Sequence, residues 1–208
     1  MQNNSFGIMQ GRLLEPPIKN DLDWFPSKTW KSEFTLAKKL PIKTIELVLD
    51  RQMDRNNPLR SVKGRKEVRQ AFLKSKLEPY SCCMNFIIDH PISDKNIFKD
   101  IKDLIIELSE IGIKNIILPL FDASSISLAN TMVYIKKLIE IVESKNIYLL
   151  IETDKSGKET LQYLSQLASK NIGVVYDIGN ATYLGHDIGE DIAVLEKIIK
   201  HIHIKDKN

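Results

Sequence analysis

The sequence has little of several features that mark specialised classes of protein. Only two of its 208 residues are cysteine, and these two, Cys82 and Cys83, are adjacent. Neighbouring side chains in a strand point to opposite faces, so the pair is poorly placed for a disulfide. We interpret them as two small buried thiols rather than a redox or metal site. A disulfide-stabilised scaffold is therefore excluded.

Long apolar runs and a large excess of one charge are also missing. Residues 147–151 form one of the longest apolar runs, whereas a membrane helix needs about 20 residues. There are 30 Lys and Arg against 27 Asp and Glu, a net charge of +3. The most basic stretch, Lys63 to Lys76, is expected to be a solvated helix face. We expect no membrane or nucleic-acid partner, and a cytoplasmic protein because residues 1–5 do not resemble a secretory signal.

What the sequence does contain is a regular alternation of short apolar segments with longer segments of helical period. The helical segments include residues 97–111, 128–142 and 188–199, and Ser156 with Glu159 fits a capping box ahead of another helix. We expect one domain over residues 1–208. The strands are predicted at Phe6 to Gln10, Thr44 to Leu49, Pro79 to Met84, Asn115 to Leu120, Tyr148 to Glu152, Gly173 to Asp177 and His201 to Lys205.

Strands that alternate with helices indicate an α/β fold with a parallel sheet, either doubly wound or closed into a barrel. A nucleotide-binding doubly wound sheet should carry a glycine fingerprint, and neither G-x-G-x-x-G nor G-x-x-x-x-G-K-[ST] occurs among the nine glycines. The pattern therefore favours a TIM-type (β/α) barrel. Such a barrel has eight units, and we see seven strands, so the eighth strand and helix are expected to be missing.

Three late strands end in side chains that can bind a metal. Glu152, Asp177 and the segment His201 to Lys205 follow apolar residues at the carboxyl ends of their strands, which meet on one face of a barrel. In the last strand, alternation places His201, His203 and Lys205 toward the barrel axis, with Ile202 and Ile204 toward the helices. Two carboxylates and an imidazole brought together favour a divalent cation, Mn²⁺ or Mg²⁺ first, with Co²⁺ and Zn²⁺ as alternatives.

Each residue also has a purely structural interpretation. Glu152 alone could be a solvated strand end, and Asp177 could cap the turn that follows it. His201 fits better as a packed layer residue than as a ligand. The case for a metal site depends on the three strand ends occurring together.

The chain resembles the sugar phosphate isomerase/epimerase superfamily, the xylose isomerase-like TIM barrels that also include the type IV endonucleases. The resemblance covers essentially the whole chain. It is carried by Phe6-Gly-Ile-Met-Gln-Gly-Arg-Leu13, Phe25-Pro26, Trp30, Glu33-Phe34, Ile45-Glu46-Leu47, Glu152, Asp177-Ile-Gly-Asn180 and His201-Ile-His-Ile-Lys-Asp206.

The resemblance implies that Glu152, Asp177 and His203 are metal ligands, with Glu152 also the catalytic base. The family's fourth ligand, commonly a Glu on strand eight, has no counterpart in this sequence. The resemblance further implies contacts to sugar hydroxyls or around the metal. The residues concerned are Gln10, Arg12, Glu46, His90, Asn180 and Lys205. Gln10 and Glu46 could equally be buried layer residues, and His90 an ordinary loop histidine.

The implied activity is a metal-dependent isomerisation or epimerisation of a sugar or sugar phosphate, by proton abstraction next to a carbonyl through an ene-diolate. The alternative is an incomplete or degenerate barrel that binds a sugar or a protein partner without turnover, with homo-oligomers forming through open sheet edges. The endonuclease branch is disfavoured. Its trinuclear zinc site needs about five histidines, and this chain has four, with Asn180 where a further one is expected.

Overall fold

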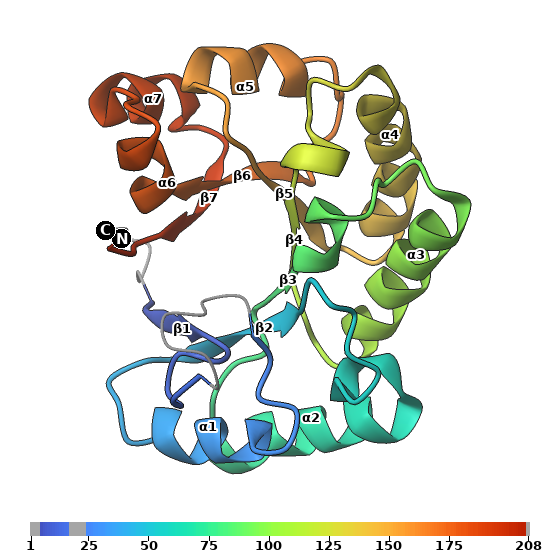
Figure 1. The fold of residues 1–208 in the computed structure, drawn as a ribbon, viewed down its shortest axis with the longest axis vertical. Helices are drawn as coiled ribbons and strands as arrows, with labels where there is room; N and C mark the ends of the chain where they lie inside the picture. The colour runs from blue at the N-terminus through green and yellow to red at the C-terminus, as the bar shows by residue number, and fades with distance from the viewer. Residues whose placement is uncertain (1–4, 17–23, 207–208) are drawn as a thin grey trace. The chain divides into compact units, whose positions relative to one another are not determined.

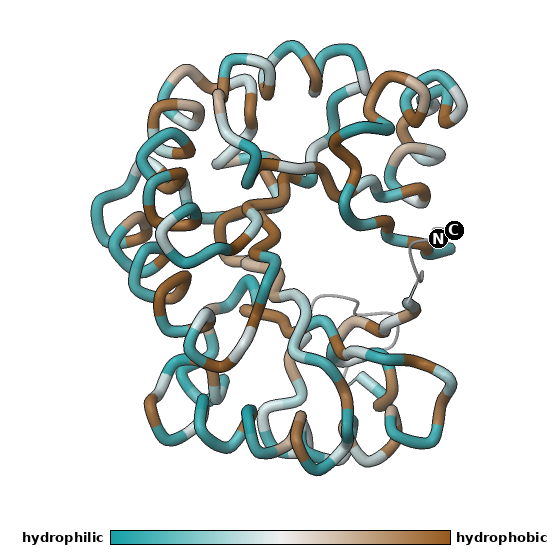
Figure 2. The backbone as a smooth tube through the Cα atoms, turned by 180° about the vertical axis from the view of Figure 1, so that it is seen from behind, coloured by the Kyte–Doolittle hydropathy of each residue, from teal (hydrophilic) through white to brown (hydrophobic). Residues whose placement is uncertain are grey.

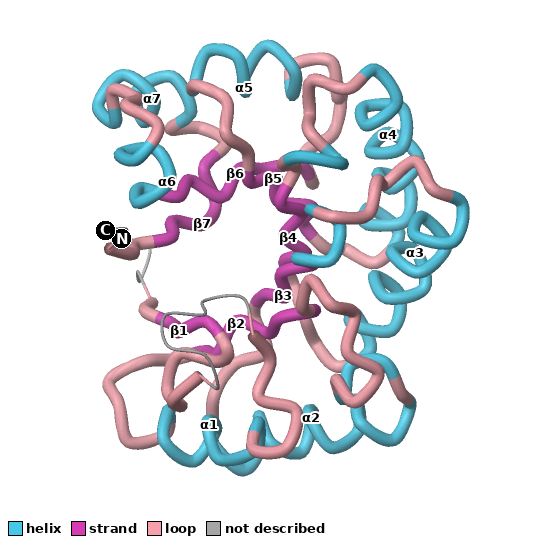
Figure 3. The backbone as a smooth tube through the Cα atoms, in the orientation of Figure 1, coloured by secondary structure: helices cyan, strands magenta, loops and turns pink. Residues whose placement is uncertain are grey.

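The computed structural model describes residues 5–16 and 24–206, in which strands and helices alternate along the chain (Figures 1 and 3). The strands are β1 (Gly7–Met9), β2 (Thr44–Leu49), β3 (Ser81–Met84), β4 (Asn115–Pro119), β5 (Tyr148–Glu152), β6 (Ile172–Asp177) and β7 (Ile199–His203). The helices are α1 (Trp30–Ala37), α2 (Val62–Ser75), α3 (Lys95–Glu110), α4 (Ala129–Ser144), α5 (Gly157–Leu164), α6 (Ile178–Tyr183) and α7 (Ile188–Leu195). Three short 3-10 helices are η1 (Pro58–Arg60), η2 (Asn85–Ile88) and η3 (Asp122–Ser124).

The strands are neighbours in chain order, β1-β2-β3-β4-β5-β6-β7. The pairs β1–β2, β2–β3, β5–β6 and β6–β7 are parallel. A doubly wound sheet would reverse its strand order at a switch point, and this sheet does not. The predicted TIM-type α/β fold is therefore confirmed, with seven strands and no eighth within residues 5–16 and 24–206.

The chain divides into two compact units. The first comprises Met1–Phe86 and Asp103–Ile116, and the second Ile87–Lys102 and Ile117–Asn208. The first unit therefore contains β1 to β3 with α1 and α2, and the second contains β5 to β7 with α4 to α7. That residues 1–208 form a single domain stays a prediction.

Each unit has an apolar interior made by its strands and by one face of each helix. In the first unit, the rings of Phe34 and Phe72 meet edge to face, with centroids 4.9 Å apart. In the second, Ile135 and Leu138 of α4 and Leu149 of β5 are fully buried. Hydrophilic and hydrophobic residues alternate along the helices (Figure 2), as expected for helices with one face against a sheet. Cys82 and Cys83 are buried free thiols, as predicted.

Several local predictions can be compared directly with the structure. The capping box forms, with Ser156 as the N-cap of α5 and Glu159 as its partner. The most basic stretch, Lys63 to Lys76, is helical up to Ser75, and Lys76 is the C-cap of α2. Among the described residues, no helix has both the length and the apolar character that crossing a membrane requires.

The last strand differs from its prediction in its bounds. β7 runs from Ile199 to His203, because its partner β6 ends at Asp177, which pairs with His203. The alternation within the strand is as predicted, with His201 and His203 half-buried and Ile202 on the other, more exposed face. Ile202 and Ile204 are 46% and 78% exposed.

Candidate metal centre

The three predicted ligands come together at the carboxyl ends of neighbouring strands of the second unit. Glu152 ends β5, Asp177 ends β6, and His203 ends β7. Parallel pairing sets the register, with Asp177 opposite His203. The two carboxylates are 6% exposed each, and the His203 side chain is 14% exposed. The sequence therefore folds so that two acids and one imidazole converge in a largely buried place.

The separations between the ligand atoms fit a bound cation. His203 Nδ1 lies 3.6 Å from Glu152 Oε2 and 3.7 Å from Asp177 Oδ2, and one ligand atom from each residue lies within 4.8 Å of the others. Two atoms bound to one ion at 2.0–2.2 Å, with an angle of 90–120° between them, are about 2.8–3.8 Å apart. Two carboxylate oxygens and one imidazole nitrogen are donors that Mn²⁺, Mg²⁺, Co²⁺ or Zn²⁺ accepts, so these residues fit a divalent cation.

Asp177 is held in its ionised form. Burial by itself raises the pKa of this carboxyl, but the nearby His203 imidazole and Lys205 ammonium, with the backbone N–H of Asn180, outweigh burial, and the pKa falls to about 2. Lys205 Nζ is 2.6 Å from Asp177 Oδ2. The carboxylate is thus ready to accept a cation without first losing a proton.

Asn180 connects the two carboxylates. Its Nδ2 donates a hydrogen bond to Glu152 Oε1 at 3.2 Å, and its backbone N–H donates to Asp177 Oδ1 at 2.8 Å. The second bond makes Asp177 the N-cap of α6. Asp177 therefore has both the capping role considered from the sequence and a place in the cluster with Glu152 and His203. One oxygen of each carboxylate is fixed by Asn180, which leaves Glu152 Oε2 and Asp177 Oδ2 facing His203.

Lys205 reaches Asp177 because of a close approach at Gly179. A Cβ atom on Gly179 would lie 2.6 Å from Lys205 Cγ and 2.8 Å from its carbonyl oxygen. Such contacts do not occur between real atoms, so only glycine permits this path for the chain after β7. Lys205, predicted to contact a sugar, is ion-paired with a predicted metal ligand in this structure.

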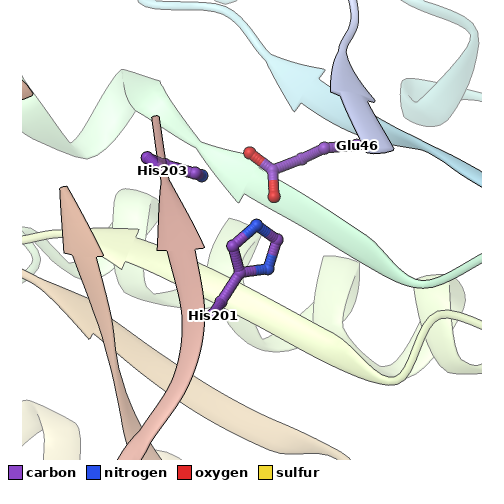
Figure 4. Close-up of side chains that lie close together, drawn as sticks. All are labelled: Glu46, His201 and His203. Atoms are coloured by element: carbon purple, nitrogen blue, oxygen red, sulfur yellow. The ribbon is translucent and has the colours of Figure 1, made fainter. Parts of the chain in front are cut away.

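His201 shares a face of β7 with His203, as the alternation predicted. The two rings are 5.0 Å apart between centroids, with an angle of 80° between their planes (Figure 4). Edge-to-face packing of this kind is what we expect of a layer residue. That His201 is a layer residue rather than a ligand stays a prediction.

Three of the other predicted contact residues, Gln10, Arg12 and Glu46, lie in the first unit. Gln10 Oε1 accepts a hydrogen bond from Val48 N at 3.3 Å, and Glu46 Oε2 accepts one from Ser81 Oγ at 2.8 Å. Both are buried, as layer residues would be. Their contact with a substrate stays a prediction.

Arg12 and His90 complete the predicted set. Arg12 is half-buried, and its Nη2 lies 3.8 Å from Met9 Sδ in the first unit. His90 is half-buried in the second unit, where its carbonyl oxygen accepts a hydrogen bond from Ser124 Oγ at 3.2 Å. A substrate contact for either side chain likewise stays a prediction.

A buried network behind β6 escaped the sequence analysis. Asp191 of α7 accepts hydrogen bonds from Gly157 N at 2.6 Å and Tyr176 Oη at 3.1 Å, and His186 Nδ1 is 3.3 Å from its carboxylate. Burial, followed by the Asp191 charge, raises the pKa of Tyr176, so the phenol stays protonated and donates. Nothing in the residues around Asp191 indicates partners 15 and 34 positions away. The network fixes Tyr176, the residue before Asp177.

Comparison with solved structures finds the same fold in sugar-modifying proteins. A 3-keto-D-glucoside 4-epimerase from E. coli matches with a TM-score of 0.73 and 15% identity, over 98% of this chain and 80% of that one. A D-psicose 3-epimerase from Clostridium cellulolyticum H10, solved with D-tagatose, matches with a TM-score of 0.72 and 14% identity, over 96% and 72%. A xylose isomerase domain protein from Planctomyces limnophilus matches with a TM-score of 0.73 and 13% identity, over 97% and 74%. At such identities the likeness concerns the fold.

Comparison of sequences shows which family the chain belongs to. No curated protein matches the chain. The family described as "Xylose isomerase-like TIM barrel" matches residues 34–208, which include Glu152, Asp177 and His203. The chain therefore belongs to the xylose isomerase-like TIM barrel family.

Proposed function

We propose that this protein is a metal-dependent isomerase or epimerase of a sugar or sugar phosphate. The observation that carries the proposal is the cluster of Glu152, Asp177 and His203, whose separations fit one divalent cation. Structures of the same fold include epimerases of keto sugars. A cation bound by these three residues would supply positive charge beside a substrate carbonyl oxygen.

Glu152 is the proposed catalytic base. It would remove the proton from the carbon next to the carbonyl, so that the C–H electron pair forms an ene-diolate and the proton resides on the carboxylate. Return of a proton to the opposite face of the same carbon gives an epimer, and return to the neighbouring carbon gives an isomer. The Asn180 amide fixes one of the oxygens of the Glu152 carboxylate.

The other residues of the cluster supply fixed charges and orient the carboxylates. Asp177, with its low pKa, stays anionic throughout. Lys205 pairs with Asp177 and is 36% exposed, so its ammonium can also meet a substrate oxygen or phosphate at the edge of the cluster. His203 presents Nδ1 to both carboxylates.

Exchange of substrate hydrogen with solvent tests the proposal. Metal-free protein is mixed with Mn²⁺, Mg²⁺, Co²⁺ or Zn²⁺ and a panel of ketoses and ketose phosphates in D₂O, and deuterium incorporation is followed by NMR. We expect exchange with at least one pair of metal and sugar, its loss in Glu152→Gln, and normal exchange in Glu196→Gln, a change at an exposed residue of the second unit.

The alternative function, binding without turnover, gives a different result. Sugar would then bind in calorimetry, while no deuterium enters any sugar with any metal. Absence of both binding and exchange would refute the proposed function and the alternative together.

A further inference from the structure

A basic groove lies between α1 and α2 of the first unit, and none of its residues takes part in the proposed reaction. The two helices pack side by side (Figure 1), with Phe34 of α1 against Phe72 of α2. The groove has a volume of about 1010 Å³, at the upper end of the range for ligand sites. We call it the lysine groove. It is lined by Lys31, Phe34, Thr35, Lys38, Val62, Lys63, Lys66, Glu67, Gln70, Ala71, Lys74 and Ser75.

The lining residues form one stripe on each helix. Along α1 and its C-cap, Lys38, they recur at positions 31, 34, 35 and 38, and on α2 at 62, 63, 66, 67, 70, 71, 74 and 75. Spacings of three and four place the members of each stripe on one helix face. The groove thus runs along two helices, and α2 with its 14 residues is about 21 Å long.

The charge of this lining is strongly positive. It contains five lysines and one glutamate, so its net charge is 5 − 1 = +4, more than the +3 of the whole chain. Lys31 Nζ is ion-paired with Glu67 at 2.6 Å. The other four lysines of the lining are exposed. Such an arrangement attracts and orients an anionic partner.

The apolar part of the lining narrows the class of partner. Phe34, Val62 and Ala71 line the groove between the lysines, so the occupant should carry apolar groups as well as acids. Phe34, the aromatic residue of the lining, is only 3% exposed. It offers no open ring face for stacking a nucleic-acid base. The groove is concave, whereas a bilayer surface is flat, so its shape does not favour a membrane as the partner.

We propose that the lysine groove binds an acidic amphipathic helix of a partner protein. Such a helix lays an apolar stripe in the groove and places acidic residues, three or four positions apart, against the lysines on both sides. A helix of about 14 residues matches the length of α2. The proposal does not depend on the metal centre, since every lining residue belongs to the first unit.

A designed peptide provides the test. The probe is a fluorescein-labelled 18-residue helix with one leucine stripe flanked by glutamates, and binding is measured by fluorescence anisotropy at two salt concentrations. The comparison peptides are the same helix with lysines for glutamates and a scrambled sequence without the stripe. We expect the acidic amphipathic helix to bind at least tenfold more tightly than either, and more weakly at high salt.

Paired substitutions locate the binding site. The double variant Lys66→Glu and Lys74→Glu should lose at least tenfold in affinity, with Lys66→Gln and Lys74→Gln as a milder pair. The matched control is Lys170→Glu and Lys197→Glu, two exposed lysines of the second unit, which should leave the affinity unchanged. Circular dichroism confirms that each variant is folded.

Three results would overturn the proposal. Equal binding of the scrambled peptide would mean that the apolar lining is not used. Equal loss in the control pair would mean that the groove is not the site. Tighter, Lys66- and Lys74-dependent binding of phosphatidylserine vesicles or of a single-stranded 20-nucleotide DNA would assign the groove to a membrane or a nucleic acid instead.

Discussion

Replacing Asp191 by alanine should destabilise the second unit strongly, because it removes the acceptor at the centre of the network behind β6. Gly157 N and Tyr176 Oη donate to this carboxylate, and Tyr176 is only 6% exposed. A buried donor left without a partner costs about 1–3 kcal/mol, so two of them cost about 2–6 kcal/mol. Tyr176→Phe removes a donor together with its need for a partner, and should cost about 1–2 kcal/mol.

Urea unfolding followed by circular dichroism measures these losses. The matched control is Glu196→Ala, an exposed acid just after α7, which should change the free energy of unfolding by less than about 0.5 kcal/mol. In the double variant, the loss should be smaller than the sum of the single losses, because Tyr176 and Asp191 share one hydrogen bond. A loss below about 1 kcal/mol for Asp191→Ala would refute the reasoning, since buried donors would then have found other partners.

Two further predictions concern the metal centre. The pKa of Asp177 falls from its ordinary 3.8 to about 2 in the folded protein. Its ionisation therefore stabilises the metal-free fold by about 2 kcal/mol above pH ~4, and this stability is lost as the pH falls toward 2. Asp177→Asn should flatten that part of an acid-unfolding curve, and an unchanged curve would contradict the low pKa of Asp177. Asn180→Ala should weaken Mn²⁺ binding about 10- to 100-fold in calorimetry, because Glu152 Oε1 loses its hydrogen bond, and wild-type affinity in this variant would rule out the positioning role.

The sequence predicted most of the strands, and the convergence of Glu152, Asp177 and His203, because strand ends can be recognised from local pattern. That the three residues bind a metal stays a prediction. β2 and β5 have the predicted bounds, since buried runs of apolar residues stop at a charged or polar side chain. The ends of parallel strands lie on one edge of a sheet, so Glu152 and Asp177 could be placed together without coordinates. The resemblance then selected His203 over His201, and the structure places His203 beside both acids.

What the sequence did not reveal depends on contacts between distant segments. The end of β7 is fixed by the end of β6 rather than by its own pattern. Asp191 meets Gly157 and Tyr176 only because α7 packs beside α5, and Lys205 reaches Asp177 only past Gly179. The segment Lys63 to Lys76 was interpreted as a solvated helix face, and its lysines are exposed. A one-dimensional pattern does not show that α1 lies beside this helix.

The most direct test of the metal centre is an anomalous diffraction map of crystals grown with Mn²⁺. We expect one strong peak within about 2.0–2.2 Å of Glu152, Asp177 and His203, and its loss in crystals of Asp177→Asn. An ordered Mn²⁺ bound elsewhere, with no density among these three side chains, would contradict it.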